Sequence, residues 1–312
     1  PAPEAGRAAA SPGGTMRRGG YGDAMGATAD NKMAVVEPIP VQNEHQLSRE
    51  MEQIKLGLAP AEKWNDKVQA MQRLEGLVLG GCSSFPAFPQ MLFELRDVLS
   101  KQVTDQRSAL CRQGCHLLSV IAEEMGKKIE ALVEVLVPVL LRGVMVTKKV
   151  ISESCNHGAL SLLYHCHAFK VVPKLCDSAC KDKHGKIRTA SFNYIQLVLE
   201  DWEPGQYEAH LDLVLHAIKQ GLNDSTPGAR TSARHCFIAL NRSWELEGER
   251  FFAGLPSNLQ RGLQQAAGQY KRVYTTSSVI GSTARSSQSS LGRSASSARS
   301  SLSSSRKRRS VG

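Results

Sequence analysis

The sequence lacks the motifs that carry common enzyme chemistry. It has no Walker phosphate-binding loop, no Rossmann glycine fingerprint, no nucleophile elbow and no HExxH helix. The glycine pairs Gly13–Gly14 and Gly19–Gly20 lie in an N-terminal segment without periodic apolar residues, where no strand and helix would frame a phosphate. We therefore predict that the chain is not an enzyme and that it takes no cofactor and no small-molecule substrate.

Long apolar runs are also missing. The longest apolar stretch, ALVEVLVPVLL at residues 131–141, is too short and too interrupted to span a bilayer. Alternating apolar and polar residues, which would predict β-strands, are absent as well. These absences predict an all-α protein that does not insert into a membrane.

The eight cysteines include no CxxC pair. They lie inside apolar helical patterns in a chain that is neither short nor led by a signal sequence, so we expect reduced thiols that fill a core. One cluster suggests zinc, because cysteine and histidine are zinc ligands. This cluster is His165, Cys166 and His167, with Cys176 and Cys180 nearby. Core packing and helix ends explain the same residues, and we predict no metal site.

Apolar residues recur at three- and four-residue spacing along most of the chain. In Val68–Leu79, for example, this spacing places Met71, Leu74 and Leu77 on one face of a helix. Similar patterns predict further helices at Met91–Leu99, Ala109–Met125, Leu132–Leu141, Val150–Tyr164, Val171–Cys180, Ile187–Leu199, Leu211–Gly221 and Ala229–Trp244.

These helices come in pairs, and the pairs repeat. Positions at or just after the turn inside each pair are separated by 43, 42, 39 and 42 residues; they are Trp64, Arg107, Lys149, Arg188 and Arg230. HEAT and armadillo repeats recur at about 40–47 residues. We therefore predict an α-solenoid of about six HEAT-like hairpins, each burying one face on its neighbours. The last pair, at residues 245–270, is the least regular and suits a terminal cap.

Composition divides the chain into three parts. Residues 1–42 are rich in Ala, Gly and Pro and predict a disordered arm, while residues 43–272 carry the helical repeats. Residues 273–312 predict a disordered, serine-rich tail. From Thr275 onward the tail has no acidic residue and carries +7 of the net charge of +10, through Arg285, Arg293, Arg299, Arg306, Lys307, Arg308 and Arg309. Such a tail attracts polyanions.

The turns inside the pairs are rich in cations. A stack of hairpins brings these turns to one edge, which would display Lys63, Trp64, Lys67, Arg107, Lys148, Lys149, Lys183, Lys186, Arg188, Arg230 and Arg234. A row of cations with one exposed indole suits an acidic protein surface, because the indole supplies buried area and the cations supply steering. The alternative is that these cations are ordinary solvated residues and that Trp64 packs between the first two helices.

Five segments that contain these turns resemble a TOG domain of the CLASP family. Trp64–Gly81 resembles the first repeat, with a Trp at the turn, and Leu99–Gly126 resembles the second, with its D-x-R-S turn. The other three matches follow in order at Val146–Ser154, Lys183–Trp202 and Asp224–Phe237. The middle TOG domain of plant-type CLASP proteins is the most similar pattern.

The resemblance implies a paddle of six HEAT repeats whose intra-repeat turns bind the αβ-tubulin heterodimer. It implies that Trp64 contacts β-tubulin and that Arg230 and Arg234 reach toward α-tubulin. CLASP proteins stabilise microtubules by suppressing catastrophe and promoting rescue, and they are not enzymes. The expected location is therefore the cytoplasmic microtubule cytoskeleton, including the cilium, the spindle or the cell cortex.

The sequence departs from the CLASP pattern in two respects. One TOG domain is visible where full CLASP proteins carry several, and EPIP at Glu37–Pro40 lacks the serine of the S-x-I-P motif that engages end-binding proteins. Two alternatives remain: a HEAT adaptor for a non-tubulin protein or RNA, and a ciliary TOG protein of the crescerin type. The tail is expected to bind the acidic microtubule lattice, with a plain linker or a nuclear signal at Arg306–Arg309 as its alternatives.

Overall fold

The computed structural model describes residue 33 and residues 35–274, and within this part every regular element is a helix. The α-helices are α1 (Glu44–Gly57), α2 (Trp64–Leu79), α3 (Phe88–Glu94), α4 (Arg96–Val103), α5 (Ser108–Met125), α6 (Glu130–Gly143), α7 (Lys149–His165), α8 (Val171–Lys181), α9 (Gly185–Asp201), α10 (Leu211–Gly221), α11 (Pro227–Ser243), α12 (Glu245–Ala253) and α13 (Ser257–Ala267). Short 3₁₀ helices are η2 (Cys82–Ser84), η3 (Gly126–Ile129), η4 (Pro204–Gln206) and η5 (Glu208–His210). No helix of the described part is long and apolar enough to cross a membrane.

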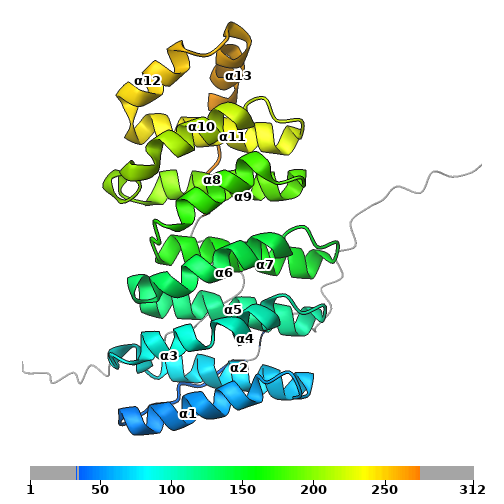
Figure 1. Ribbon diagram of the computed structural model, residues 1–312, viewed down its shortest axis with the longest axis vertical. Helices are drawn as coiled ribbons and strands as arrows, with labels where there is room; N and C mark the ends of the chain where they lie inside the picture. The colour runs from blue at the N-terminus through cyan, green and yellow to red at the C-terminus, as the bar shows by residue number, and fades with distance from the viewer. Residues whose placement is uncertain (1–32, 34, 275–312) are drawn as a thin grey trace, which may run out of the picture.

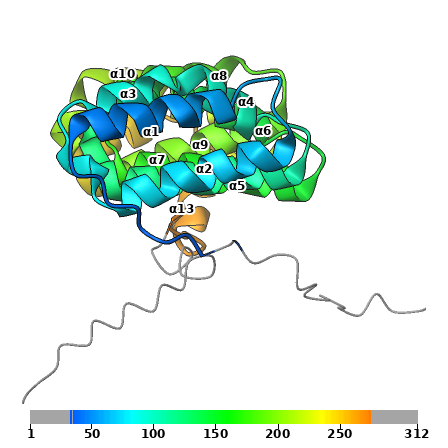
Figure 2. The same ribbon diagram turned by 90° about the horizontal axis from the view of Figure 1, so that it is seen from below.

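Consecutive helices form hairpins that stack along one axis (Figure 1). The hairpins are α1 with α2, α3–α4 with α5, α6 with α7, α8 with α9, and α10 with α11. Helices α12 and α13 follow, and each packs against α11. Seen along the stack in Figure 2, the first helices form one layer and the second helices form the other. In the second layer α5 packs between α2 and α7, and α9 packs between α7 and α11. The predicted all-α solenoid of HEAT-like hairpins is therefore confirmed.

The core lies between the two layers and is built from apolar stripes of the predicted kind. In α5, Leu110, Leu117 and Ile121 are spaced seven and four residues apart and are all buried. Burial of each such side chain stabilises the fold by about 1.5–3 kcal/mol. Helix α5 ends at Met125 and is followed by Gly126, whose φ of +51° is a backbone conformation that glycine adopts without a steric penalty. A glycine there lets the chain turn into the next hairpin.

Extended residues before α1 pack along the outer side of α2. The Ile39 amide donates to the Gly76 carbonyl oxygen over 2.8 Å. Gly76 and Gly80 lie one helical turn apart, and a Cβ atom on Gly80 would stand 2.0 Å from the Ile39 carbonyl oxygen. Two glycines at this spacing therefore let the backbone approach the helix. The EPIP segment is part of this contact rather than free chain.

Residues after α13 return along α9. The Gln196 amide donates to the Lys271 carbonyl oxygen over 2.8 Å, and the Val273 amide donates to Glu200 Oε2 over 3.3 Å. Tyr274 is buried, with its ring centroid 4.8 Å from that of Tyr164. Composition predicted that the helical domain spans residues 43–272. Residues outside these limits, Ile39 before it and Tyr274 after it, also pack against the helices. A few apolar residues, Ile39 and Tyr274 among them, are enough to hold segments that composition assigns to the arm and the tail.

Candidate protein-binding edge

The turns inside the first five hairpins lie along one edge of the stack, on the right in Figure 1. We call this surface the turn edge; it comprises residues 58–63, 104–107, 144–148, 182–184 and 222–226 with the first turns of the helices that follow. Hydrogen bonds join neighbouring turns. The Lys148 ammonium donates to the Gln106 carbonyl oxygen over 2.9 Å, and Arg142 Nη1 donates to Asp182 Oδ2 over 2.6 Å. These bonds tie the third turn to the second, and the end of α6 to the fourth turn.

The first turn presents a large aromatic side chain. Helix α2 begins at Trp64, whose side chain is 46% exposed, and the preceding Lys63 is exposed too. Lys67 lies one turn into the helix and its ammonium donates to the Pro60 carbonyl oxygen over 3.3 Å, which closes the turn. The structure therefore places Trp64 at the surface rather than between the first two helices. Lys67 helps to hold the turn that presents it.

The second and third turns present cations as well. Arg107 is the last residue of the second turn. Its backbone amide donates to Asp105 Oδ1 over 2.7 Å, while its guanidinium stays exposed, 3.8 Å from the same carboxylate. Lys149 is 84% exposed and lies 3.6 Å from Glu153. Ion pairs this exposed are weak, so neither cation is withdrawn from solvent. Lys148 is exposed as well, although its ammonium donates to the Gln106 carbonyl oxygen of the second turn.

The third turn also exposes two apolar side chains that sequence reasoning missed. Met145 is 41% exposed and Val150 is 44% exposed, on either side of the cations Lys148 and Lys149. The available signal was the pattern VMVTKKV, in which apolar residues continue through a turn where the helical stripe has ended. The third turn therefore offers apolar area beside its cations, like the first.

The Arg188 side chain, which belongs to the fourth turn, is not exposed for contact with a partner. Its guanidinium donates from Nε to Asp224 Oδ2 over 2.6 Å, from Nη2 to Asp224 Oδ1 over 2.8 Å, and from Nη1 to the Asp182 carbonyl oxygen over 2.8 Å. Only 12% of the side chain is exposed. The Arg188 hydrogen bond lowers the pKa of Asp224 below its ordinary value. We therefore correct our expectation for Arg188, which braces the fourth turn against the fifth. Lys186 and Lys183 remain exposed.

The two arginines predicted for the fifth turn are only partly exposed. Arg230 Nη1 donates to the carbonyl oxygens of Asp224 and Ser225, over 2.6 and 3.0 Å, and so closes its own turn. Arg234 lies about two turns into α11, where its guanidinium packs against Gly262 of α13. The fifth turn shares the line of the edge, but the structure does not bring the side chain of Arg234 to it.

The cysteine and histidine cluster singled out in the sequence does not converge. His167 stacks on Trp202 with ring centroids 5.1 Å apart and shares a 2.9 Å hydrogen bond with Gln206. Cys166 and Cys176 are buried, and burial raises the pKa of each thiol to about 12. Among the described residues this cluster does not form a group of three candidate metal ligands, and Cys166 and Cys176 belong to the core.

A different group of thiols meets between α5 and α7. Within the described residues, the one group of three candidate metal ligands is Cys111, Cys115 and Cys155, whose Sγ atoms lie within 4.8 Å of one another. The Cys111 thiol donates to the Val103 carbonyl oxygen over 3.1 Å. All three side chains are buried in the interface of the second and third hairpins. We assign them to the core.

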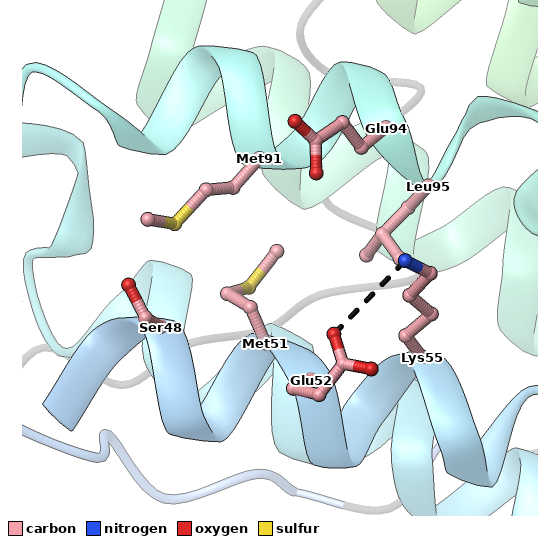
Figure 3. Close-up of a pocket in the computed structure, with 7 residues that line it drawn as sticks. All are labelled: Ser48, Met51, Glu52, Lys55, Met91, Glu94 and Leu95. Carbon is pink, nitrogen blue, oxygen red and sulfur yellow. Dashed lines mark ion pairs between the residues drawn. The ribbon is translucent and has the colours of Figure 1, made fainter. Parts of the chain in front are cut away.

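A shallow pocket lies between α1 and the α3–α4 segment, in the layer of first helices (Figure 3). Met51 and Met91 extend into it from opposite sides, and Lys55 lies 4.0 Å from Glu52 at its rim. Its volume of about 170 Å³ is below the range of about 300–1,000 Å³ that is typical of small-molecule sites. This pocket does not favour a ligand site.

Comparison with known proteins decides the family. The family described as "CLASP N terminal" matches residues 47–264. The chain belongs to this CLASP family. The CLIP-associated protein of Arabidopsis thaliana is 33% identical over 256 residues, which are 82% of this chain and 18% of that protein. The chain spans less than a fifth of the length of the first curated relatives it matches.

Solved structures support the TOG fold of this CLASP domain. The MAST/Orbit N-terminal domain matches with a TM-score of 0.53 at 16% identity, over 75% of this chain and 98% of that one. The TOG3 domain of Drosophila melanogaster Mini spindles matches with a TM-score of 0.53 at 14% identity, over 70% of this chain and 93% of that one. The resemblance to a CLASP TOG domain is confirmed. The CLASP family is non-enzymatic, in agreement with our prediction.

Proposed function

We propose that this CLASP-family domain binds αβ-tubulin through its turn edge and acts as a microtubule-associated protein that stabilises microtubules or regulates their dynamics. The observation that carries the proposal is the exposed indole of Trp64 at one end of a continuous row of turns with presented cations. The proposed location is accordingly the cytoplasmic microtubule cytoskeleton. Relatives whose names and structures concern microtubules and TOG–tubulin recognition support the same partner.

The chemistry of the turn edge suits an acidic protein partner. Tryptophan and arginine are the side chains most often found at the energetic centre of protein interfaces, because they bury much area and make directed contacts. Lysines around such an anchor speed association with a negatively charged surface and are sensitive to salt. The proposed contact residues are Lys63, Trp64, Arg107, Met145, Lys149, Val150 and Lys186.

The remaining cations predicted as contacts are proposed to have structural roles instead. Lys67, Lys148, Arg188 and Arg230 hold the turns in place through bonds to backbone or carboxylate oxygens, and Arg234 packs on α13. The basic tail of residues 275–312 lies outside the described residues. Its proposed lattice contact, through the seven cations from Arg285 to Arg309, stays a prediction.

The test is binding of the full chain to unpolymerised tubulin, measured by co-elution in size-exclusion chromatography and by titration. Trp64→Glu is expected to weaken binding at least about 30-fold, which corresponds to the loss of one interface hot spot of about 2 kcal/mol. Leu246→Glu is the matched control, because Leu246 is 64% exposed but belongs to α12, away from the proposed contacts. Equal binding by wild type and Trp64→Glu would contradict the proposal, as would a wild-type chain that does not bind.

A further inference from the structure

A cleft of about 370 Å³ opens between the third and fourth hairpins, beside the turn edge. It is lined by Val144, Ser152, Glu153, Asn156, Lys186, Thr189, Ala190, Asn193 and Thr226. Helices α7 and α9 form its walls, and the exposed Lys186 belongs both to the cleft and to the proposed contact residues. The volume lies within the range of binding sites, about 300–1,000 Å³. A side chain of a partner docked on the turn edge would fit inside.

Hydrogen bonds fix the orientation of two side-chain amides in the cleft, those of Asn156 and Asn193. The Tyr194 hydroxyl donates to Asn156 Oδ1 over 3.1 Å, and the Ser232 hydroxyl donates to Asn193 Oδ1 over 2.7 Å. Each amide oxygen therefore already holds a donor. The group that remains is the Nδ2 amide nitrogen, with two hydrogens to donate. Within residues 35–274, neither Nδ2 atom is assigned a hydrogen-bond acceptor.

Two hydroxyl groups of the cleft donate to backbone carbonyl oxygens and are not available to a ligand. The Ser152 hydroxyl donates to the Val144 carbonyl oxygen over 2.8 Å, and the Thr189 hydroxyl donates to the Gly185 carbonyl oxygen over 2.7 Å. The one acidic lining residue, Glu153, lies 3.6 Å from the Lys149 ammonium. The Thr226 hydroxyl oxygen accepts from Arg188 Nη2 over 3.0 Å, which leaves its proton available. The donors that the cleft offers to a ligand are therefore the two amide groups, the Thr226 hydroxyl and the Lys186 ammonium. These donors favour a ligand that accepts several hydrogen bonds, and the charge of Lys186 favours a carboxylate among such ligands.

We propose that this cleft receives an aspartate or glutamate carboxylate from the protein bound at the turn edge. The inference rests on the proposed function, since it takes tubulin as that partner. A carboxylate has several lone pairs and accepts from two or more donors at once, and bonds of this kind are stronger than those between neutral groups. The two amides fix the position of the carboxylate and Lys186 supplies the opposite charge. The cleft would therefore set the register of the partner along the edge.

The test replaces each amide by the isosteric acid in the full chain, as Asn156→Asp and Asn193→Asp. Either variant keeps a carboxylate oxygen to accept the Tyr194 or Ser232 hydroxyl, so the fold is preserved, and thermal unfolding checks this. Each removes an Nδ2 donor and places a negative charge where the partner carboxylate would lie. Gln53→Glu is the matched control, because it makes the same chemical change at an exposed position of α1.

Tubulin binding is then titrated for all four chains at one salt concentration. We expect Asn156→Asp and Asn193→Asp each to weaken binding by about tenfold or more, as like charges opposed across an interface do, and Gln53→Glu to leave binding unchanged. If the wild type binds but both cleft variants bind as Gln53→Glu does, the cleft inference is wrong and the proposed function stands. If the wild type does not bind, the proposed function itself is wrong, so the two failures are distinguishable.

Discussion

The first three turns of the turn edge and the last two carry cations of the same kind but use them differently. In the front turns Arg107 and Lys149 remain exposed, beside the apolar side chains of Trp64, Met145 and Val150. In the rear turns the arginines bond to the turns themselves, and lysines are the cations left at the surface. The first three turns therefore expose both apolar side chains and cations to a partner. The last two turns expose lysines, while their arginines hold the turns in place.

The difference has a local cause in the positions of aspartates. Asp182 and Asp224 each precede an arginine by six residues, and in both turns that arginine donates to the aspartate carbonyl oxygen. The second turn has the same kind of aspartate, Asp105, but Cys111 at the corresponding position. Without an arginine to return to the turn, the second turn leaves its cation, Arg107, in solvent. An arginine six residues after the aspartate thus returns to its turn, whereas Arg107, two residues after Asp105, stays exposed.

Removal of Arg188 tests the bracing role and should have the largest effect on stability. Arg188→Ala leaves the half-buried Asp224 without its ion-pair partner, and breaking such a pair costs up to about 3 kcal/mol. The lower free energy of unfolding would be measured by urea denaturation. The unfolding free energy of Arg188→Lys should lie between those of the wild type and Arg188→Ala, because an ammonium keeps the charge but cannot make the paired bonds of the guanidinium.

Arg107→Ala is the control for this prediction, since it removes the same residue type from the front of the edge. Its exposed guanidinium contributes less than about 0.5 kcal/mol to stability, but the variant should weaken tubulin binding. Arg188→Ala should bind tubulin like the wild type at temperatures where it remains folded. The opposite assignment, with Arg188→Ala stable and defective in binding, would reverse our comparison of front and rear.

The exposed apolar side chains of the third turn allow a second test of the front surface. Met145→Glu and Val150→Glu should each weaken tubulin binding by about tenfold, because each places a charge in a contact that buries apolar area. Stability should change little, since both side chains are more than two-fifths exposed. Leu213→Glu in α10, where the side chain is 46% exposed in the other layer, is the matched control. Unchanged binding by both third-turn variants would restrict the apolar contact to the first turn.

Much of this fold follows from local sequence. The apolar spacing and the 39- to 43-residue intervals between turns predicted the hairpins, because each helix needs a buried stripe and each stack needs a repeat. The same reasoning predicted which segments would meet at one edge. Trp64 was open to two interpretations from sequence, and the structure resolves them by its 46% exposure.

The roles of individual cations were less predictable, because they depend on contacts between repeats. Arg188 meets Asp224 only when the fourth and fifth hairpins stack, 36 residues apart in the chain. Arg234 lies on the same helix as Arg230, yet α13 covers it. Periodicity places residues on an element and at a height in the stack. It does not state which neighbouring turn supplies a carboxylate.

The smallest expected effect concerns the pH dependence of the rear brace. The folded-state pKa of Asp224 is below the ordinary value of 3.8, chiefly because of its hydrogen bonds with Arg188. A carboxyl group of this kind contributes its full stability above the unfolded-state pKa and loses that contribution as the pH falls through the folded-state value. The difference in unfolding free energy between wild type and Asp224→Asn should therefore be constant from about pH 5 to 7 and shrink below about pH 4.

Urea denaturation of both chains across this range measures the difference directly. Asp105→Asn is the control from the front turns, because the Asp105 carboxylate accepts the Arg107 amide but only an exposed guanidinium lies near it. Its difference from wild type should be small at every pH. A wild-type advantage over Asp224→Asn that persists unchanged to pH 3 would show that the ionised carboxylate is not what holds the fourth and fifth turns together. The rear of the edge would then be braced by the backbone bonds of Arg188 and Arg230 alone.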